Sequence, residues 1–67
     1  MKIHLNNRLE SFNSDTITIQ EILDEKNFSF KMLVIKINGR LIPKENYNIT
    51  SVYEGDDVNI LHLISGG

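Results

Sequence analysis

The first residues of the chain alternate between apolar and polar side chains. Apolar residues take every second position of residues 1–6, and the alternation resumes over residues 9–12. A period of two predicts a β-strand that buries one of its faces. Because the intervening Asn6-Asn7 accepts positive φ, we expect a tight hairpin between the two strands.

After residue 16 the spacing of the apolar residues changes from that of a strand to that of a helix, which predicts one helix. Ile19, Ile22 and Leu23 recur at the spacing of a single helix face, and the residues between them are polar or acidic. Thr18 and Glu21 have the spacing of a capping box, in which each side chain accepts a hydrogen bond from the backbone N–H of the other residue. We therefore expect a helix from about residue 19 to residue 26, with Ile17 and Ile22 packed across its first turn.

A second hairpin is predicted after the helix. Residues 32–37 are the most apolar run of the chain and contain several β-branched side chains, which is typical of a central strand. Asn38-Gly39 is a strong signal for a type I′ turn, because both central residues of that turn need positive φ. Residues 40–42 should then return alongside, and Pro43 confines that strand to an edge of the sheet.

The last strand is predicted over residues 58–64, after a turn at residues 54–57. The order is thus two strands, one helix and three strands. It indicates an α+β fold in which the helix covers one face of a mixed sheet of four or five strands. This is the order of the β-grasp (ubiquitin-like) fold, in which the first and last strands lie side by side and parallel. We expect residues 1–67 to form a single domain.

Inward positions of these elements predict the core. Its members are expected to be Ile3, Leu5, Ile22, Leu23, Leu33, Ile35, Ile37, Val58 and Ile60. The aromatic residues Phe28, Phe30 and Tyr47 are expected to pack at its margin.

The face of the sheet away from the helix is expected to carry an apolar patch. If Val58 and Ile60 point to the helix, alternation turns Leu61 and Leu63 to the opposite face. Val34 lies on the same face of the neighbouring strand. We interpret Val34, Leu61 and Leu63 as a docking surface for larger proteins.

Composition narrows the class of function. The chain has 67 residues, of which 40% are hydrophobic and 24% charged, and it contains no cysteine. A core of this size supplies only about 3 to 5 kcal/mol of stability, which leaves little for a catalytic cleft and favours a binding or carrier role. The absence of cysteine excludes disulfides and thiolate chemistry on the chain itself.

The charge pattern and the hydropathy narrow the expected partners. The net charge is −2 and the basic residues form no stripe, so nucleic acid is not expected as a partner. The sequence has no run of about 18 apolar residues and no apolar leader, so neither a membrane span nor export is expected, and we expect a cytoplasmic protein.

No set of side chains points to catalysis or to a metal. His4 and His62 lack a third ligand at a suitable spacing, and Asp56 and Asp57 beside Gly55 are better interpreted as turn residues. No nucleophile, base and orienting group can be assembled, so an enzyme is the class least favoured and no metal site is expected.

The chain ends in Ser65-Gly66-Gly67, directly after the last predicted strand. With this ending, the chain resembles the ubiquitin-like sulfur carriers of the ThiS/MoaD family, and among them especially the ThiS carriers of thiamine biosynthesis. The resemblance spans nearly the whole chain and rests on residues 1–3, 18–23, 37–44 and 54–58 as well as on Gly66-Gly67. Asn7 and Ser65 depart from the pattern, since glycine is frequent in the family at both places.

The resemblance implies a specific chemistry at the C-terminus. A ThiF-type enzyme would use ATP to adenylate the Gly67 carboxylate, and sulfur from a persulfide-bearing enzyme would convert it to a thiocarboxylate. A ThiG-type thiazole synthase would then receive the sulfur. Gly66 and Ser65 would thread through the narrow channel of the partner, where glycine avoids a clash. The carrier would bind no cofactor itself and would be a monomer when alone.

Two other functions stay open at this stage. One is the MoaD-type small subunit of molybdopterin synthase, and the other is a ubiquitin-like protein modifier or interaction module. The shortness of the chain favours the thiamine carrier over the MoaD type.

Overall fold

The computed structural model describes residues 1–28 and 32–62. Its first two strands, β1 (Lys2–Leu5) and β2 (Arg8–Ser11), are antiparallel neighbours, as the predicted tight turn at Asn6-Asn7 requires. The turn between them holds Asn6 at φ 52° and Asn7 at φ 66°. Both residues lie in the left-handed region that asparagine tolerates better than most side chains, which confirms the predicted hairpin.

The helix α1 (Ile19–Glu25) is confirmed together with its cap. The Glu21 backbone N–H donates to the Thr18 hydroxyl at 3.1 Å, and the Thr18 N–H donates to the Glu21 carboxylate at 2.9 Å. Ile17 and Ile22 are both buried, as expected of the residues that pack across the first turn. Lys26 ends the helix at its C-cap.

The second hairpin joins β4 (Leu33–Ile37) to β5 (Arg40–Ile42). Asn38 and Gly39 have φ values of 51° and 84°, so both central residues of the turn take the positive φ that a type I′ turn requires. Pro43 follows β5 and precedes the short 3-10 helix η1 (Lys44–Asn46). The predicted edge position of β5 is confirmed.

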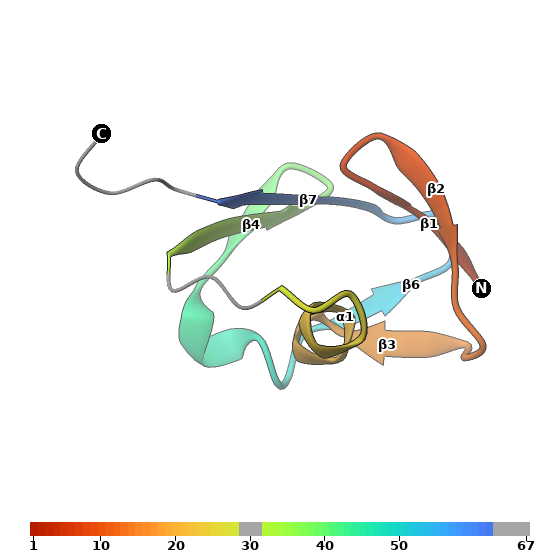
Figure 1. Cartoon of the computed structure of the whole chain (residues 1–67), viewed down its shortest axis with the longest axis horizontal. Helices are drawn as coiled ribbons and strands as arrows, with labels where there is room; N and C mark the ends of the chain where they lie inside the picture. The colour runs from red at the N-terminus through yellow and green to blue at the C-terminus, as the bar shows by residue number, and fades with distance from the viewer. Residues whose placement is uncertain (29–31, 63–67) are drawn as a thin grey trace.

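The last strand, β7 (Asp57–His62), lies in the middle of a five-stranded mixed sheet. The order is β2-β1-β7-β4-β5, in which β7 is parallel to β1 and antiparallel to β4. Figure 1 shows α1 on one side of this sheet. The β-grasp prediction is confirmed, with five strands in the main sheet. Residues 63–64, the predicted end of the last strand, lie outside the described residues.

A small second sheet was not predicted. It pairs β3 (Thr16–Thr18) with β6 (Ser51–Tyr53), and it lies on the helix side of the main sheet (Figure 1). Each strand has only three residues, and Thr18 is both the last residue of β3 and the N-cap of α1. A strand pattern of three residues is weak, and at Thr18 the sequence shows the capping box of the helix more clearly than the strand.

The core lies between the main sheet, the helix and the small sheet. Seven of the nine predicted core residues are buried, but Leu33 and Ile37 are only half-buried and pack against the core from its margin. Leu33 lies at the start of β4, and Ile37 lines a pocket beside the second hairpin. The buried residues that were not predicted as core are Phe12, Ile17, Ile19, Ile42, Tyr47 and Val52. Of the marginal aromatic residues, Tyr47 is fully in the core, Phe28 is half-buried, and Phe30 lies outside the described residues.

Within residues 1–28 and 32–62, no helix is both long enough and apolar enough to cross a membrane.

Candidate functional site

The face of the main sheet opposite the helix carries the predicted docking patch. Val34 of β4 lies directly opposite Leu61 of β7 in the antiparallel register, so the two side chains are cross-strand neighbours on one face. Leu61 is 57% exposed and Val34 is half-buried. These two residues lie together as predicted, and Leu63, the third member, lies outside the described residues.

Leu41 of β5 enlarges this apolar surface and was missed from the sequence. It lies opposite Lys36 in register and is 60% exposed. Lys36 follows Val34 at a spacing of two, so all three side chains share the open face. We call Val34, Leu41 and Leu61 the apolar patch. The two-residue turn at Asn38-Gly39 was the available signal, because it determines which residue of the return strand faces Lys36.

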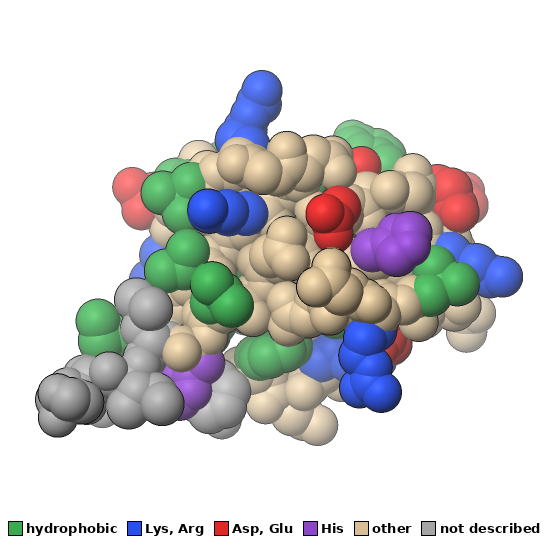
Figure 2. Space-filling view, turned by 90° about the horizontal axis from the view of Figure 1, so that it is seen from above, with side chains coloured by type: hydrophobic (Ala, Val, Ile, Leu, Met, Phe, Trp, Pro, Cys, Tyr) green, Lys and Arg blue, Asp and Glu red, His purple; other side chains and the backbone are tan. Residues whose placement is uncertain are grey.

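Figure 2 looks onto this open face. In this view hydrophobic side chains gather toward the left end beside a Lys or Arg side chain, one histidine lies toward each end, and the right end carries acidic, basic and further hydrophobic side chains. By register, His4 of β1 lies next to Asp57 at the start of β7, two strands from β4. Leu9 of β2 lies opposite His4 and is 61% exposed, so the open face near the beginning of β7 holds both polar and apolar side chains.

The two histidines are not brought together. His4 is adjacent to the first residue of β7, whereas His62 is the last residue of that strand and is paired with Leu33. Alternation along β7 also places His62 on the face opposite Leu61. Among the described residues, no group of three His, Asp or Glu side chains is close enough to hold a metal ion.

Asparagine side chains attach the turns of the sheet to β7. The Asn6 carboxamide accepts from the Ile60 N–H at 2.7 Å and donates to the Ile60 carbonyl at 3.1 Å. In the other hairpin, the Asn38 carboxamide accepts from the Asp57 N–H at 2.9 Å and donates to the Asp56 carboxylate at 3.2 Å. Each asparagine thus connects segments that are far apart in sequence. The two hairpins on either side of β7 both form side-chain hydrogen bonds with β7 or with the turn before it.

The acidic turn before β7 has a structural role in the described contacts. The Asp56 carboxylate accepts from the Tyr53 N–H at 2.9 Å, in addition to its contact with Asn38. The Lys2 N–H donates to the Glu54 carboxylate at 2.8 Å, and Gly55 has φ 84°. These contacts agree with the interpretation of residues 54–56 as a turn, whereas Asp57, predicted as a turn residue, is the first residue of β7.

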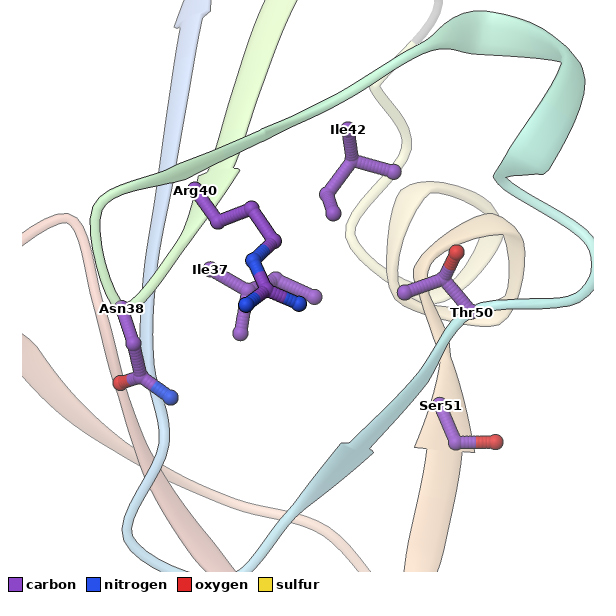
Figure 3. Close-up of a pocket in the computed structure, with 6 residues that line it drawn as sticks. All are labelled: Ile37, Asn38, Arg40, Ile42, Thr50 and Ser51. Atoms are coloured by element: carbon purple, nitrogen blue, oxygen red, sulfur yellow. The ribbon is translucent and has the colours of Figure 1, made fainter.

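A pocket of about 350 Å³ lies beside the second hairpin, on the other side of the sheet from the apolar patch. Its lining residues are Ile37, Asn38, Arg40, Ile42, Thr50 and Ser51. Figure 3 shows the Arg40 side chain extending over this hollow from β5, with Thr50 and Ser51 on the far side. Sequence reasoning missed this pocket, because it depends on how β6 approaches the edge of the main sheet.

The predicted tail residues Ser65, Gly66 and Gly67 lie outside the described residues.

A family model and a curated relative both point to the ThiS family. The model of the ThiS family matches residues 3–67. The sulfur carrier protein ThiS of Bacillus subtilis (strain 168) is 29% identical over 65 residues, which are 97% of this chain and 98% of that protein. A protein of Porphyra purpurea described as uncharacterized protein ycf40 is 30% identical over 59 residues, which are 87% of this chain and 83% of that protein.

Solved structures show the same fold. The crystal structure of the thiamine biosynthesis protein ThiS from Geobacter metallireducens has a TM-score of 0.88, 22% identity and full coverage of both chains. A solution structure of a thiamine biosynthesis protein from the same organism has a TM-score of 0.79 and 22% identity, and it covers all of this chain and 88% of that one. Together with the match of the family model over nearly the whole sequence, these findings show that the chain belongs to the ThiS family.

Proposed function

We propose that this chain is a sulfur carrier of thiamine biosynthesis and that its Gly67 carboxylate is the chemical site. The observation that carries the proposal is the match of the ThiS family to residues 3–67, which includes the terminal Gly66-Gly67. The Bacillus relative, named as a sulfur carrier, aligns over almost its whole length and supports the same role. In this proposal the chain is a protein co-substrate and the catalysis belongs to its partners.

The chemistry follows from the properties of a terminal carboxylate. With an ordinary pKa of about 3.3 to 3.7 the group is ionised at neutral pH, so it is a nucleophile but a poor acceptor of sulfur. Attack of a carboxylate oxygen on the α-phosphorus of ATP releases pyrophosphate and gives an acyl-adenylate. Hydrosulfide attacks the carbonyl carbon, displaces AMP and leaves a thiocarboxylate on Gly67. The terminal sulfur of a persulfide also displaces AMP but gives an acyl disulfide; attack of a donor thiol on the outer sulfur then releases the thiocarboxylate and leaves a disulfide on the donor. ATP binds to the partner enzyme, and the carrier needs no bound cofactor.

Gly66 and Ser65 serve this chemistry as the threaded part of the tail. Residues with small or absent side chains let a backbone pass through a narrow channel and approach a nucleotide closely. The partners proposed are a ThiF-type adenylating enzyme, a persulfide-bearing sulfur donor and a ThiG-type thiazole synthase. Val34, Leu61 and Leu63 are proposed as the surface on which the larger partners dock.

Intact-mass spectrometry tests the proposal directly. Incubation with ATP, a ThiF-type enzyme and sodium sulfide should add about 16 Da, because one oxygen of the acyl group is replaced by sulfur. A chain without Gly67, or one extended by one residue, should fold normally and gain no mass. Gly66→Val should slow the reaction, because its side chain restricts φ and fills the channel. A gain of the same mass without Gly67, or none on the intact chain with competent partners, would refute the carrier role.

A second step separates the thiamine pathway from its alternatives. The thiocarboxylated chain should lose its sulfur when mixed with a ThiG-type thiazole synthase and its substrates. Transfer only to the large subunit of molybdopterin synthase would instead support the MoaD-type alternative. Amide-linked attachment to other proteins would support a ubiquitin-like modifier.

A further inference from the structure

The outer strand of the main sheet has an unpaired side. β5 ends the strand order β2-β1-β7-β4-β5, so within the described residues it pairs only with β4. A free edge offers backbone N–H and C=O groups that an added strand can bind. β5 has three residues, and its Arg40 and Ile42 line one pocket together with Thr50 and Ser51.

The register identifies Leu41 as the residue that offers its backbone outward. Ile37 and Arg40 flank the two-residue turn and form the closing hydrogen-bonded pair of the hairpin. Hydrogen-bonded and non-hydrogen-bonded pairs alternate in an antiparallel ladder, so the next pair, Lys36 and Leu41, is not bonded across the strands. The Leu41 N–H and C=O therefore point away from β4. None of the described backbone hydrogen bonds outside the helices and strand ladders involves Leu41.

The pocket beside this edge has a volume of about 350 Å³ and lies where side chains of an added strand would enter. Ile37 and Ile42 supply apolar lining from the main sheet, and Thr50 and Ser51 line the opposite side. Arg40 extends over the same hollow (Figure 3). Along β5, Arg40 and Ile42 thus lie on the pocket side and Leu41 lies on the open face, where it is 60% exposed.

The charge of Arg40 indicates which side chain the pocket would take. Among the described residues the one ion pair joins Lys26 to Glu10 at 2.7 Å, so Arg40 has no carboxylate partner there. A guanidinium is well suited to bind a carboxylate through two parallel hydrogen bonds. The hydroxyl side chains of Thr50 and Ser51 add no opposing charge at the far side of the hollow.

Two other occupants fit these observations less well. A free small anion would meet a single exposed cation and would leave the apolar lining and the strand edge unused. A second copy of the chain, paired edge to edge, would bring Arg40, Leu41 and Ile42 of its own β5, none of which carries a carboxylate. An extended segment with an acidic residue uses the edge, the hollow and the charge together.

We propose that β5 and its pocket bind an extended segment of a partner protein by strand addition, with an Asp or Glu side chain of that segment paired to Arg40. In antiparallel pairing the acidic residue lies opposite Arg40, and the residue before it lies opposite Leu41 on the open face. Strand addition of this kind draws affinity from the backbone and specificity from alternate side chains. The proposal is independent of sulfur transfer and can fail without affecting it.

Titration of ¹⁵N-labelled protein with two peptides tests the proposal. The first is acetyl-Thr-Val-Leu-Glu-Thr-amide, and the second has glutamine in place of glutamate. The glutamate peptide should shift the amide signals of Leu41, Ile42 and Ser51. It should bind about three- to tenfold more tightly than the glutamine peptide, because it adds a charge-assisted hydrogen bond to Arg40.

Two variants that change the net charge equally distinguish a specific ion pair between Arg40 and the glutamate from a general electrostatic attraction of the peptide. Arg40→Gln should abolish the difference between the two peptides. Arg8→Gln removes an exposed arginine from β2, at the opposite edge of the sheet, and should leave the difference unchanged. Both variants should retain the amide spectrum of the parent outside the site of substitution, which shows that the fold is intact.

Four results would overturn the proposal. One is equal affinity of the parent protein for the two peptides, and another is no shift with peptide at about 5 mM, where even millimolar binding is detectable. A third is the same shifts with sodium acetate alone, which would indicate a simple anion site. The last is a concentration-dependent shift at β5 without peptide, which would indicate pairing with a second copy.

Discussion

At the scale of single residues, asparagine has two roles in this chain. Asn6, Asn7 and Asn38 all hold positive φ in turns, where most side chains are strained. Asn6 and Asn38 also use their carboxamides to bind the backbone of β7 or of the turn before it. Glycine in place of Asn6 or Asn38 would adopt the positive φ of the turn, but the hydrogen bonds from the carboxamide would be lost.

Asn6 and Asn7 therefore allow a matched comparison. Asn6→Gly should lower the free energy of unfolding by about 1 kcal/mol, because two partly buried hydrogen bonds to Ile60 are lost while turn strain is relieved. Asn7→Gly relieves the same kind of strain without those bonds and should be neutral or slightly stabilising. Urea unfolding of both variants measures the difference. Equal midpoints for the two variants would contradict the attachment role of Asn6.

Tyr47 predicts a pH dependence. Burial raises the pKa of the Tyr47 phenol above its ordinary value of about 10. The fold thus favours the neutral phenol, so this contribution to stability is complete below about pH 10 and is lost as the pH rises through the higher pKa of the folded state.

The substitution Tyr47→Phe should make unfolding less sensitive to alkaline pH than it is in the parent. Tyr53→Phe, at an exposed tyrosine, is the control and should retain the sensitivity of the parent. The pH sensitivity of stability is measured as the difference between the urea midpoints at about pH 9 and at about pH 11. If the two variants lose stability equally between these values, Tyr47 does not carry the effect.

At the scale of elements, β4 divides its side chains between two environments. Ile35 is fully buried and lies opposite both Ile42 and Ile60, whereas Val34 beside it belongs to the open face. The same strand thus supports the core and presents the apolar patch. Substitutions at adjacent positions should have very different consequences.

Ile35→Ala should cost about 2 to 5 kcal/mol, because it removes buried methyl groups and leaves a cavity. That loss is comparable to the whole stability expected of a core this small. Val34→Ala should cost less than about 1 kcal/mol, because its side chain is already partly in water. Thermal unfolding followed by circular dichroism measures both, and similar melting temperatures for the two variants would show that the core assignment is wrong.

The elements also show what the sequence can and cannot predict. The two turns with positive φ and the Thr18 cap are local, so their residues alone indicate both hairpins and the start of the helix. The pairing of Val34 with Leu61 was predictable because period two and the β-grasp order determine it together. The small sheet was not, because three-residue strands such as β3 and β6 owe their pairing to tertiary packing. The pocket at Arg40 depends on the same packing and carries no local signal.

At the scale of the whole molecule, the two faces of the main sheet lie in different environments. One face packs against the helix and the core, and the other leaves the apolar patch in solvent. A charge introduced on the patch should therefore affect binding without affecting the fold. Leu61 and Leu9 are similarly exposed, at 57% and 61%, and both lie on the open face by register.

These two leucines provide the test of the docking surface. Leu61→Asp should weaken binding to a ThiF-type or ThiG-type enzyme at least tenfold, because it places a charge where apolar area is buried on association. Leu9→Asp, on β2 and two strands from β7, should have little effect. Both variants should melt close to the parent temperature. Unchanged affinity of Leu61→Asp, measured by calorimetry, would rule out the patch.

The parallel pairing of β1 with β7 has a mechanical consequence. A pull applied beyond His62 and resisted at the N-terminus acts along both strands, so it loads their hydrogen bonds together in shear. Those bonds include His4 N–H to the Asp56 carbonyl and Asn6 N–H to the Val58 carbonyl, each at 2.9 Å. Antiparallel strands pulled from one end would instead separate one bond at a time. If an enzyme pulled on the residues after β7, the paired strands β1 and β7 would therefore resist unfolding by that force, although the core of the domain is small.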